Sequence, residues 1–355
     1  MVSVVKAAGF TTFVLVTDAD KRTVTPLERL PLRPLDMERE WAEFRDRFAR
    51  DGAQYRTPLT LALCREYQPD VLVCDETDFG GMLAAERFGI PYAPVLVRAE
   101  GSFVRPEVIG DALQELRAEH GLSPDPALEM LHRYLVLSPF PPGFRNPAYP
   151  LPATAHSFRQ SVLGRGAVPA WVSAQPGALT IYFTLGTIFN LESGDLFQRV
   201  LAGLRDLPIN LLVTVGRHID PAEFGPQPAH IRIAQFIPQA EILPYCDLVV
   251  SHGGSGSVAG ALAHGLPSVL IPMGADQPLN AARCQALGIA QALDPVEATP
   301  ESVRAAVNAV LEDPTYRQAV ERLRDEIAAL PEIVQAVPLL ERLAVEQRPL
   351  VRQAL

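Results

Sequence analysis

The chain has 355 residues, with 31 basic and 41 acidic side chains and a formal net charge of −10. This length favours two domains over a single hydrophobic core. The 48% of apolar residues argues against global disorder. The acidic balance, with no Lys/Arg cluster, argues against nucleic acid as a partner. No apolar run reaches the roughly 18 residues that a membrane-spanning helix needs.

Four cysteines are scattered along the chain without a CxxC pair, at Cys64, Cys74, Cys246 and Cys284. This pattern predicts neither a zinc site nor a disulfide framework. The opening segment lacks a clean signal-peptide cleavage site. We therefore expect a soluble, cytoplasmic protein with reduced thiols, and the sequence leaves its oligomeric state open.

The first half of the chain alternates short apolar runs with helical patterns. The opening predicts the end of a helix, a glycine turn and a strand, "TTFVLV", and a long helical pattern covers 37–67. Apolar strands at 69–74 and 90–97 flank a helix at 80–89. Strands that are apolar throughout indicate a parallel sheet covered on both faces, which is the α/β class.

A proline-rich stretch from Ser138 to Pro176 predicts a connecting segment and a domain boundary near residue 170. The alternation then restarts, with strands expected at 178–186, 209–216, 231–236, 246–251 and 267–273 and helices from Pro300 onward. We therefore predict two domains, 1–170 and 171–355, with the last helix free to return to the first domain.

The segment "SHGGSGSVAGALAHGLP", residues 251–267, follows one of these strands and opens a helix near Ser255. Glycines let backbone N–H groups approach a ligand, and the positive end of the helix favours an anion such as a phosphate. His252, Ser255 and Ser257 add side-chain donors. A purely structural interpretation stands beside this one: the glycines make a tight turn and Ser255 caps the helix.

Three further turns follow strands in the second domain. Gly186 and Thr187 form a second backbone-donor turn. Phe236 and Ile237 follow another strand, where a ring can stack on a base and a main chain can contact its edge, although Phe236 by itself fits a core equally well. The third turn carries Asp276 and Gln277, an acid–amide pair suited to sugar hydroxyls or, alternatively, a helix N-cap.

The run from Gln235 to Ala290 resembles the donor-binding signature of nucleotide-sugar glycosyltransferases, including the macrolide, glycopeptide and enediyne enzymes and their plant and animal relatives. This resemblance implies the GT-B fold, with two Rossmann-like domains facing across a cleft. It also implies donor-binding roles in base stacking, diphosphate binding and sugar binding for Gly186, Thr187, Phe236, Ile237, Gln239, His252, Gly253, Gly254, Ser255, Gly256, Ser257, Asp276 and Gln277. No cofactor or metal is expected, because the helix dipole and His252 offset the charge of the leaving diphosphate.

One position departs from the family pattern. Many relatives with a ribose donor carry a glutamate eight residues after the histidine, where it binds the ribose hydroxyls, and this chain has Gly260 there. A dTDP-sugar has no 2′-hydroxyl and loses less from that change than a UDP-sugar. The alternative explanation is that glycine allows close helix packing.

The resemblance implies an inverting transfer in which a histidine takes the proton of an acceptor hydroxyl, steadied by an aspartate. Asp75 matches that aspartate, although by itself it also fits a helix cap or a turn acid. The histidine has no counterpart, since the first of the seven is His120. Three explanations stay open: a truncated or misplaced start, a mechanism without that base, or a protein that does not catalyse.

The expected activity is transfer of a sugar from a dTDP- or UDP-sugar to a hydroxyl of a lipophilic small molecule. The alternatives are an inactive nucleotide-sugar-binding scaffold and a nucleotide-sugar epimerase of the same fold. For the acceptor pocket the resemblance suggests the aromatic residues Trp41, Phe44, Phe79 and Phe103, which a core would accommodate equally. A "DAD" at Asp18 and Asp20 resembles a metal-binding motif that is common by chance.

Overall fold

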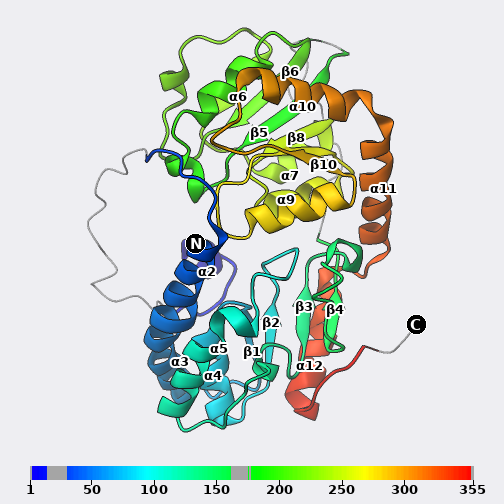
Figure 1. Ribbon diagram of the computed structural model, residues 1–355. Helices are drawn as coiled ribbons and strands as arrows, with labels where there is room; N and C mark the ends of the chain where they lie inside the picture. The colour runs from blue at the N-terminus through cyan, green and yellow to red at the C-terminus, as the bar shows by residue number, and fades with distance from the viewer. Residues whose placement is uncertain (1, 14–29, 161–174, 176, 353–355) are drawn as a thin grey trace.

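The computed structural model describes residues 2–13, 30–160, 175 and 177–352. It shows two α/β units stacked one above the other, each built on a parallel sheet (Figure 1). This is the predicted fold class. The "DAD" motif, the predicted boundary near 170 and residues 14–16 of the strand expected at 11–16 lie outside the described residues. The predicted helix end and glycine turn are present as α1, Val2–Ala7, and a turn at Gly9, whereas residues 11–13 are not in a strand.

The N-terminal sheet has four parallel strands in the order β1-β2-β3-β4. The strands are β1 Leu72–Asp75, β2 Tyr92–Val95, β3 Val136–Ser138 and β4 Ala155–Ser157. The helices of this half are α2 Met37–Phe44, a π-helical turn Arg45–Gly52, α3 Ala53–Tyr67, α4 Phe79–Phe88 and α5 Pro106–Glu119. The helices and the sheet enclose an apolar core that includes Phe44, Phe79, Met82, Tyr92 and Phe103.

The C-terminal sheet has six parallel strands in the order β10-β9-β8-β5-β6-β7. The strands are β5 Leu179–Thr184, β6 Ile209–Thr214, β7 Ile231–Ala234, β8 Leu248–Ser251, β9 Ser268–Leu270 and β10 Ala290–Ala292. The helices are α6 Leu196–Leu204, α7 Gln239–Ile242, α8 Ser255–Ala263, α9 Gln277–Ala286, α10 Pro300–Glu312 and α11 Pro314–Ala329. The order reverses between β5 and β8, which makes this a doubly wound Rossmann-type sheet.

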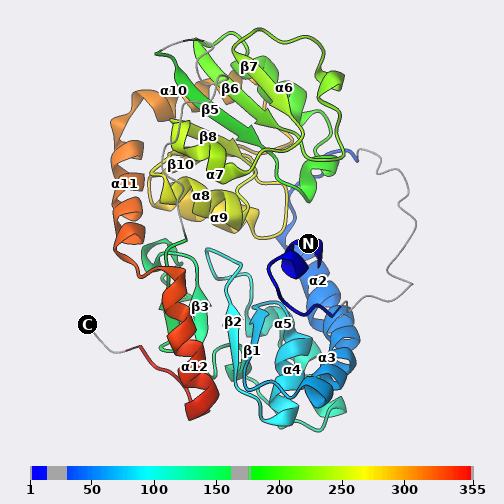
Figure 2. The same ribbon diagram turned by 180° about the vertical axis from the view of Figure 1, so that it is seen from behind.

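The chain passes between the two units, since Leu30 and Leu32 contact the C-terminal unit before α2 begins. After α11 it returns to the N-terminal unit, where α12, Ala336–Glu346, lies beside β3 and β4 (Figures 1 and 2). Ala336 and Leu343 pack there with Leu137 and Phe158. The units also meet directly, since the Arg283 guanidinium donates to the carbonyls of Phe144 and Gly143, each at 2.9 Å.

The structure differs from the sequence predictions at several elements, including α5 and β3, which the sequence did not predict. The proline-rich stretch predicted as a connection contains β4, an edge strand of three residues that pairs with β3 and whose prolines fall outside the ladder. The expectation of only a connection there is wrong. The short strand β10 has no apolar pattern that would predict it. The helix expected near Glu192 is a 3₁₀ turn, Phe189–Glu192, and α6 begins at Leu196.

All four cysteines are buried and free. Within the described ranges, no helix is both long enough and apolar enough to cross a bilayer.

Candidate donor site

Two glycine turns meet at the point where the C-terminal strand order reverses. Strands β5 and β8 are neighbours, with Thr184 paired to Ser251, so the turns that follow them start side by side. Gly186 and Gly253 have φ of +76° and +79°, a left-handed conformation that favours glycine. The predicted turns therefore come together at the edge where doubly wound sheets bind ligands.

The imidazole of His252 fills the space between these turns. A Cβ at Gly186 would lie 2.6 Å from this ring, and a Cβ at Gly254 would lie 2.5 Å from its Nε2, so both positions require glycine. Burial lowers the pKa of His252 to about 4, although the Asp276 carboxylate and the Thr184 backbone oppose the shift. The ring is therefore neutral near pH 7, and its buried Nδ1 has no partner in the described part of the chain.

Helix α8 directs its N-terminus at the same place. Its N-cap residue, Gly254, has no side chain to satisfy the first N–H groups, and a Cβ at Gly256 would meet no atom within 4 Å. Ser255 is not the cap, because its hydroxyl donates to Asp276 Oδ2 at 2.6 Å. Ser257 is buried and accepts from Gln239 Nε2 at 3.2 Å.

Asp276 lies beside Ser255 and links several elements. It occupies the N-cap position of α9, yet its side chain makes no capping bond. Its Oδ2 accepts from Ser255 and from Asn280 Nδ2 at 3.0 Å, and its Oδ1 accepts from Arg98 Nη1 at 3.0 Å. The neighbouring Gln277 accepts from the Met273 N–H at 2.8 Å, which closes the turn before α9. Asp276 therefore occupies the predicted N-cap position, but its side chain bonds to other elements and does not cap the helix.

Phe236 lies on the other side of the turns, after β7. Its ring is 52% exposed, so it is not a core residue, and the Arg217 guanidinium lies 5.1 Å from the ring centroid. Ile237 is half-buried against an apolar cluster under α7, and Thr187 is exposed beside the turn after β5. Phe236 therefore presents an aromatic face to the surface.

Close packing around position 260 explains why the residue there is a glycine. A Cβ there would lie 2.8 Å from Leu243 Cδ1 and 3.3 Å from Gln239 Oε1. The close-packing explanation thus fits the structure, and the position carries no carboxylate.

The N-terminal candidates are more dispersed. Asp75 is exposed at the end of β1, where its Oδ1 accepts from the backbone N–H and the hydroxyl of Thr77 at 2.7 and 2.6 Å. Phe44, Phe79 and Phe103 are at most 3% exposed and pack on one another, with Phe44 in contact with both other rings. Their suggested place in an acceptor-pocket wall is therefore wrong, because the three rings are buried in the hydrophobic core. Trp41 is half-buried beneath the Arg105 guanidinium.

Three charged residues near the junction of the units were not predicted from the sequence. Arg98 contacts Asp276, and Glu40 accepts from the Ala275 N–H at 2.6 Å. Glu76 is buried and accepts from the backbone N–H groups of Val97 and Arg98, and burial raises its pKa to about 7. Their local sequence resembles solvent-facing helix and loop positions, so no local signal identifies them.

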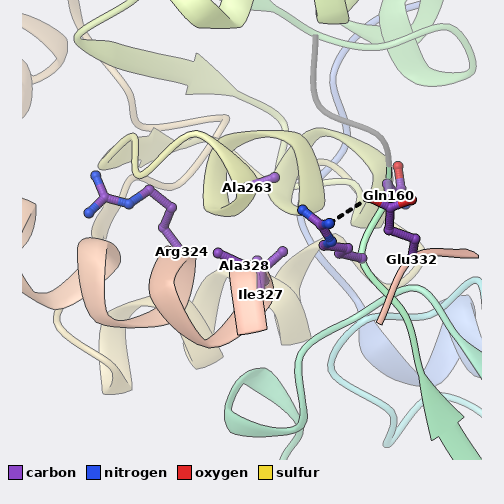
Figure 3. Close-up of a pocket in the computed structure, with 7 residues that line it drawn as sticks. Gln160, Ala263, Arg324, Ile327, Ala328 and Glu332 are labelled. Carbon is purple, nitrogen blue, oxygen red and sulfur yellow. Dashed lines mark hydrogen bonds and ion pairs between the residues drawn. The ribbon is translucent and has the colours of Figure 1, made fainter. Parts of the chain in front are cut away.

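Two cavities lie apart from these turns. One of about 370 Å³ is bounded by Ala263, Ile327 and Ala328, and an ion pair of 2.6 Å joins Arg159 and Glu332 at its edge (Figure 3). The other, of about 310 Å³, lies in the N-terminal unit. Among the described residues, no group of three His, Cys, Asp or Glu side chains is placed to hold a metal ion.

Comparison with known proteins identifies relatives of this chain. Residues 198–343 match the family described as "Erythromycin biosynthesis protein CIII-like, C-terminal domain". The chain is 31% identical to 10-deoxymethynolide desosaminyltransferase of Streptomyces venezuelae, over 80% of this chain and 70% of that protein. It is 30% identical to 4'-demethylrebeccamycin synthase of Lentzea aerocolonigenes, over 85% of this chain and 80% of that protein.

Among solved structures, the glycosyltransferase VinC in complex with dTDP has a TM-score of 0.70 and 22% identity, covering 97% of this chain and 90% of that one. This likeness shows the shared fold. The matches to the two sequence relatives extend over most of those proteins. They confirm the family resemblance that the run from Gln235 to Ala290 indicated. The chain belongs to the natural-product glycosyltransferases of the GT-B fold.

Proposed function

We propose that this glycosyltransferase moves a sugar, with inversion, from a dTDP-sugar to a hydroxyl group of a lipophilic natural product. The observation that carries the proposal is the meeting of two backbone-donor turns around His252, in front of the α8 N-terminus. Backbone N–H groups and a helix N-terminus attract the two phosphates of a nucleotide diphosphate. The roles of the individual donor residues follow from this placement.

The two ends of the donor then fall on either side of the diphosphate. The exposed ring of Phe236 offers a stacking face for the base, with the Ile237 main chain beside it. Asp276, which bonds Ser255, and its neighbour Gln277 would supply polar groups for the sugar. In the transfer, the bond from the acceptor oxygen to the anomeric carbon forms as the bond from that carbon to the diphosphate breaks, and the acceptor proton passes to a base. Asp75 suits the partner of such a base.

The choice of dTDP over UDP rests on Gly260 and on the relatives. Gly260 brings no carboxylate to a ribose 2′-hydroxyl, and Leu243 and Gln239 fill the space beside it. The complex of the related VinC contains dTDP. A deoxyribose has no 2′-hydroxyl and so loses fewer hydrogen bonds than a ribose where the carboxylate is absent, which favours dTDP.

We place the binding site of the lipophilic acceptor in the N-terminal unit. Its cavity of about 310 Å³ is lined by apolar residues such as Leu96, Val104 and Leu131, with Glu76 and Arg145 among the polar ones. An apolar wall with a few polar groups is typical of sites for small organic ligands.

Calorimetric titration with dTDP, UDP and thymidine tests the donor site. We expect dTDP to bind more tightly than UDP, and His252→Ala to weaken dTDP binding by about 10- to 100-fold while thymidine binding changes little, because only the diphosphate contacts the imidazole. Binding of dTDP no tighter than about millimolar by the folded wild-type protein, about −4 kcal/mol, would contradict the proposal. An equal loss for dTDP and thymidine would contradict the role of His252.

The neutral state of His252 predicts a pH dependence of stability. Its pKa is about 4 in the folded protein and near 6.5 when unfolded, so the unfolded chain binds more protons between these values. The contribution to stability is complete above about pH 6.5 and is lost as the pH falls towards 4. Between pH 7 and 4, the free energy of unfolding should fall by about 3 kcal/mol more for wild type than for His252→Gln, as measured by urea denaturation. Parallel pH profiles would show that the imidazole is not held neutral.

Phe236→Ala tests base stacking. Loss of the ring should weaken dTDP binding by about 1 to 3 kcal/mol, the range measured for aromatic–base stacking in nucleic-acid complexes. Phe88→Ala is the matched control, since Phe88 is also a partly exposed phenylalanine but belongs to α4 of the N-terminal unit. Unchanged dTDP affinity in Phe236→Ala would remove this ring from the donor site.

A further inference from the structure

Arg98 is the residue of the N-terminal unit that reaches the expected sugar-binding carboxylate. It follows β2, and its Nη1 lies 3.0 Å from Oδ1 of Asp276 at the start of α9. The side chains are 19% and 7% exposed, so water screens this ion pair little. The contact places a cation from one unit directly on a residue that the family resemblance assigns to the donor sugar in the other.

The position of Arg98 is fixed from several sides. Its backbone N–H donates to the buried carboxylate of Glu76, and its carbonyl accepts from Arg145 Nη1 at 3.2 Å. The guanidinium carbon lies 5.8 Å from the ring centroid of Phe44 and 5.4 Å from that of Phe103. Its Nε is buried without a hydrogen-bond partner in the described part of the chain. The side chain is thus a preorganised cation with unused donor capacity.

Asp276 has little acceptor capacity left. Ser255 and Asn280 occupy Oδ2, and Arg98 occupies one side of Oδ1. A carboxylate offers about four acceptor positions, which leaves roughly one for a ligand. The charge of Asp276 is compensated by Arg98, so the pair presents one acceptor and the remaining guanidinium donors, with no net charge.

We propose that Arg98 is a specificity-determining residue that makes this enzyme select neutral, hydroxylated donor sugars over sugars with a protonated amine. A hydroxyl can donate to Asp276 Oδ1 and accept from the guanidinium. A sugar ammonium group can only donate, and it meets the cation of Arg98 at short range, where like charges repel. This inference rests on the proposed function of the C-terminal turns as a donor site.

The test compares three ligands by calorimetry: dTDP, dTDP-glucose and dTDP-4-amino-4,6-dideoxyglucose. Wild type should bind dTDP-glucose about 10-fold more tightly than the amino sugar. Arg98→Met keeps the apolar stem and removes the cation, so dTDP-glucose binding should weaken about 10-fold, dTDP binding should stay within about twofold, and the preference for glucose should disappear. Arg98→Lys keeps a charge without the planar fork and should retain discrimination against the amine.

Arg56→Met is the matched control, because Arg56 also pairs with an aspartate, Asp78 at 3.6 Å, but on the exposed surface of the N-terminal unit. It should leave all three affinities unchanged. Circular dichroism checks that each variant is folded. An unchanged sugar preference in Arg98→Met with normal dTDP binding, or an equal loss for dTDP and dTDP-glucose, would overturn the role of Arg98. Failure of wild type to bind dTDP would instead overturn the proposed function.

Discussion

The buried carboxylate of Asp276 ties the turns of the C-terminal unit to the N-terminal unit. It accepts from Ser255 at the start of α8, from Asn280 in α9 and from Arg98 of the N-terminal unit. Ser255 accepts in turn from the Ala99 N–H at 2.8 Å. One buried acid therefore joins α8, α9 and the loop after β2. Replacing it would remove the acceptor of the Ser255 hydroxyl and of Arg98 Nη1, while Asn280 Nδ2 would keep its bonds to the Gly253 carbonyl and to Ser255.

The second constraint is steric and concerns His252, which lies two residues before Gly254, the N-cap of α8. His252 fits between Gly186 and Gly254 only because neither has a side chain. The same fit buries most of the imidazole and keeps it neutral, since burial penalises the charged form. A neutral ring can donate a hydrogen bond to a phosphate oxygen, and the α8 N-terminus supplies the positive potential. The glycines thus set both the shape and the protonation state of this turn.

The sequence predicted the C-terminal unit well because its signals are local. Apolar strands, glycine turns and the Asp276-Gln277 pair each occur within a few residues, and parallel pairing brings their ends to one edge. The predictions failed where the outcome depends on packing between distant segments. The sequence cannot distinguish whether Phe44, Phe79 and Phe103 line a pocket or belong to the core. Only their contacts with one another show that they belong to the core. Arg98 and Glu76 give no local signal, since their partners are supplied by other loops or by the second unit.

The charged junction between the units also constrains what can enter it. Arg98, Glu76 and Asp276 are largely withdrawn from water, and their desolvation is offset by hydrogen bonds from backbone and side chains. A ligand that separates these groups must replace the bonds it breaks. A sugar hydroxyl both donates and accepts, so it can take the place of either partner, whereas an apolar group would leave a buried charge unpaired. The junction therefore favours polar ligand groups over apolar ones.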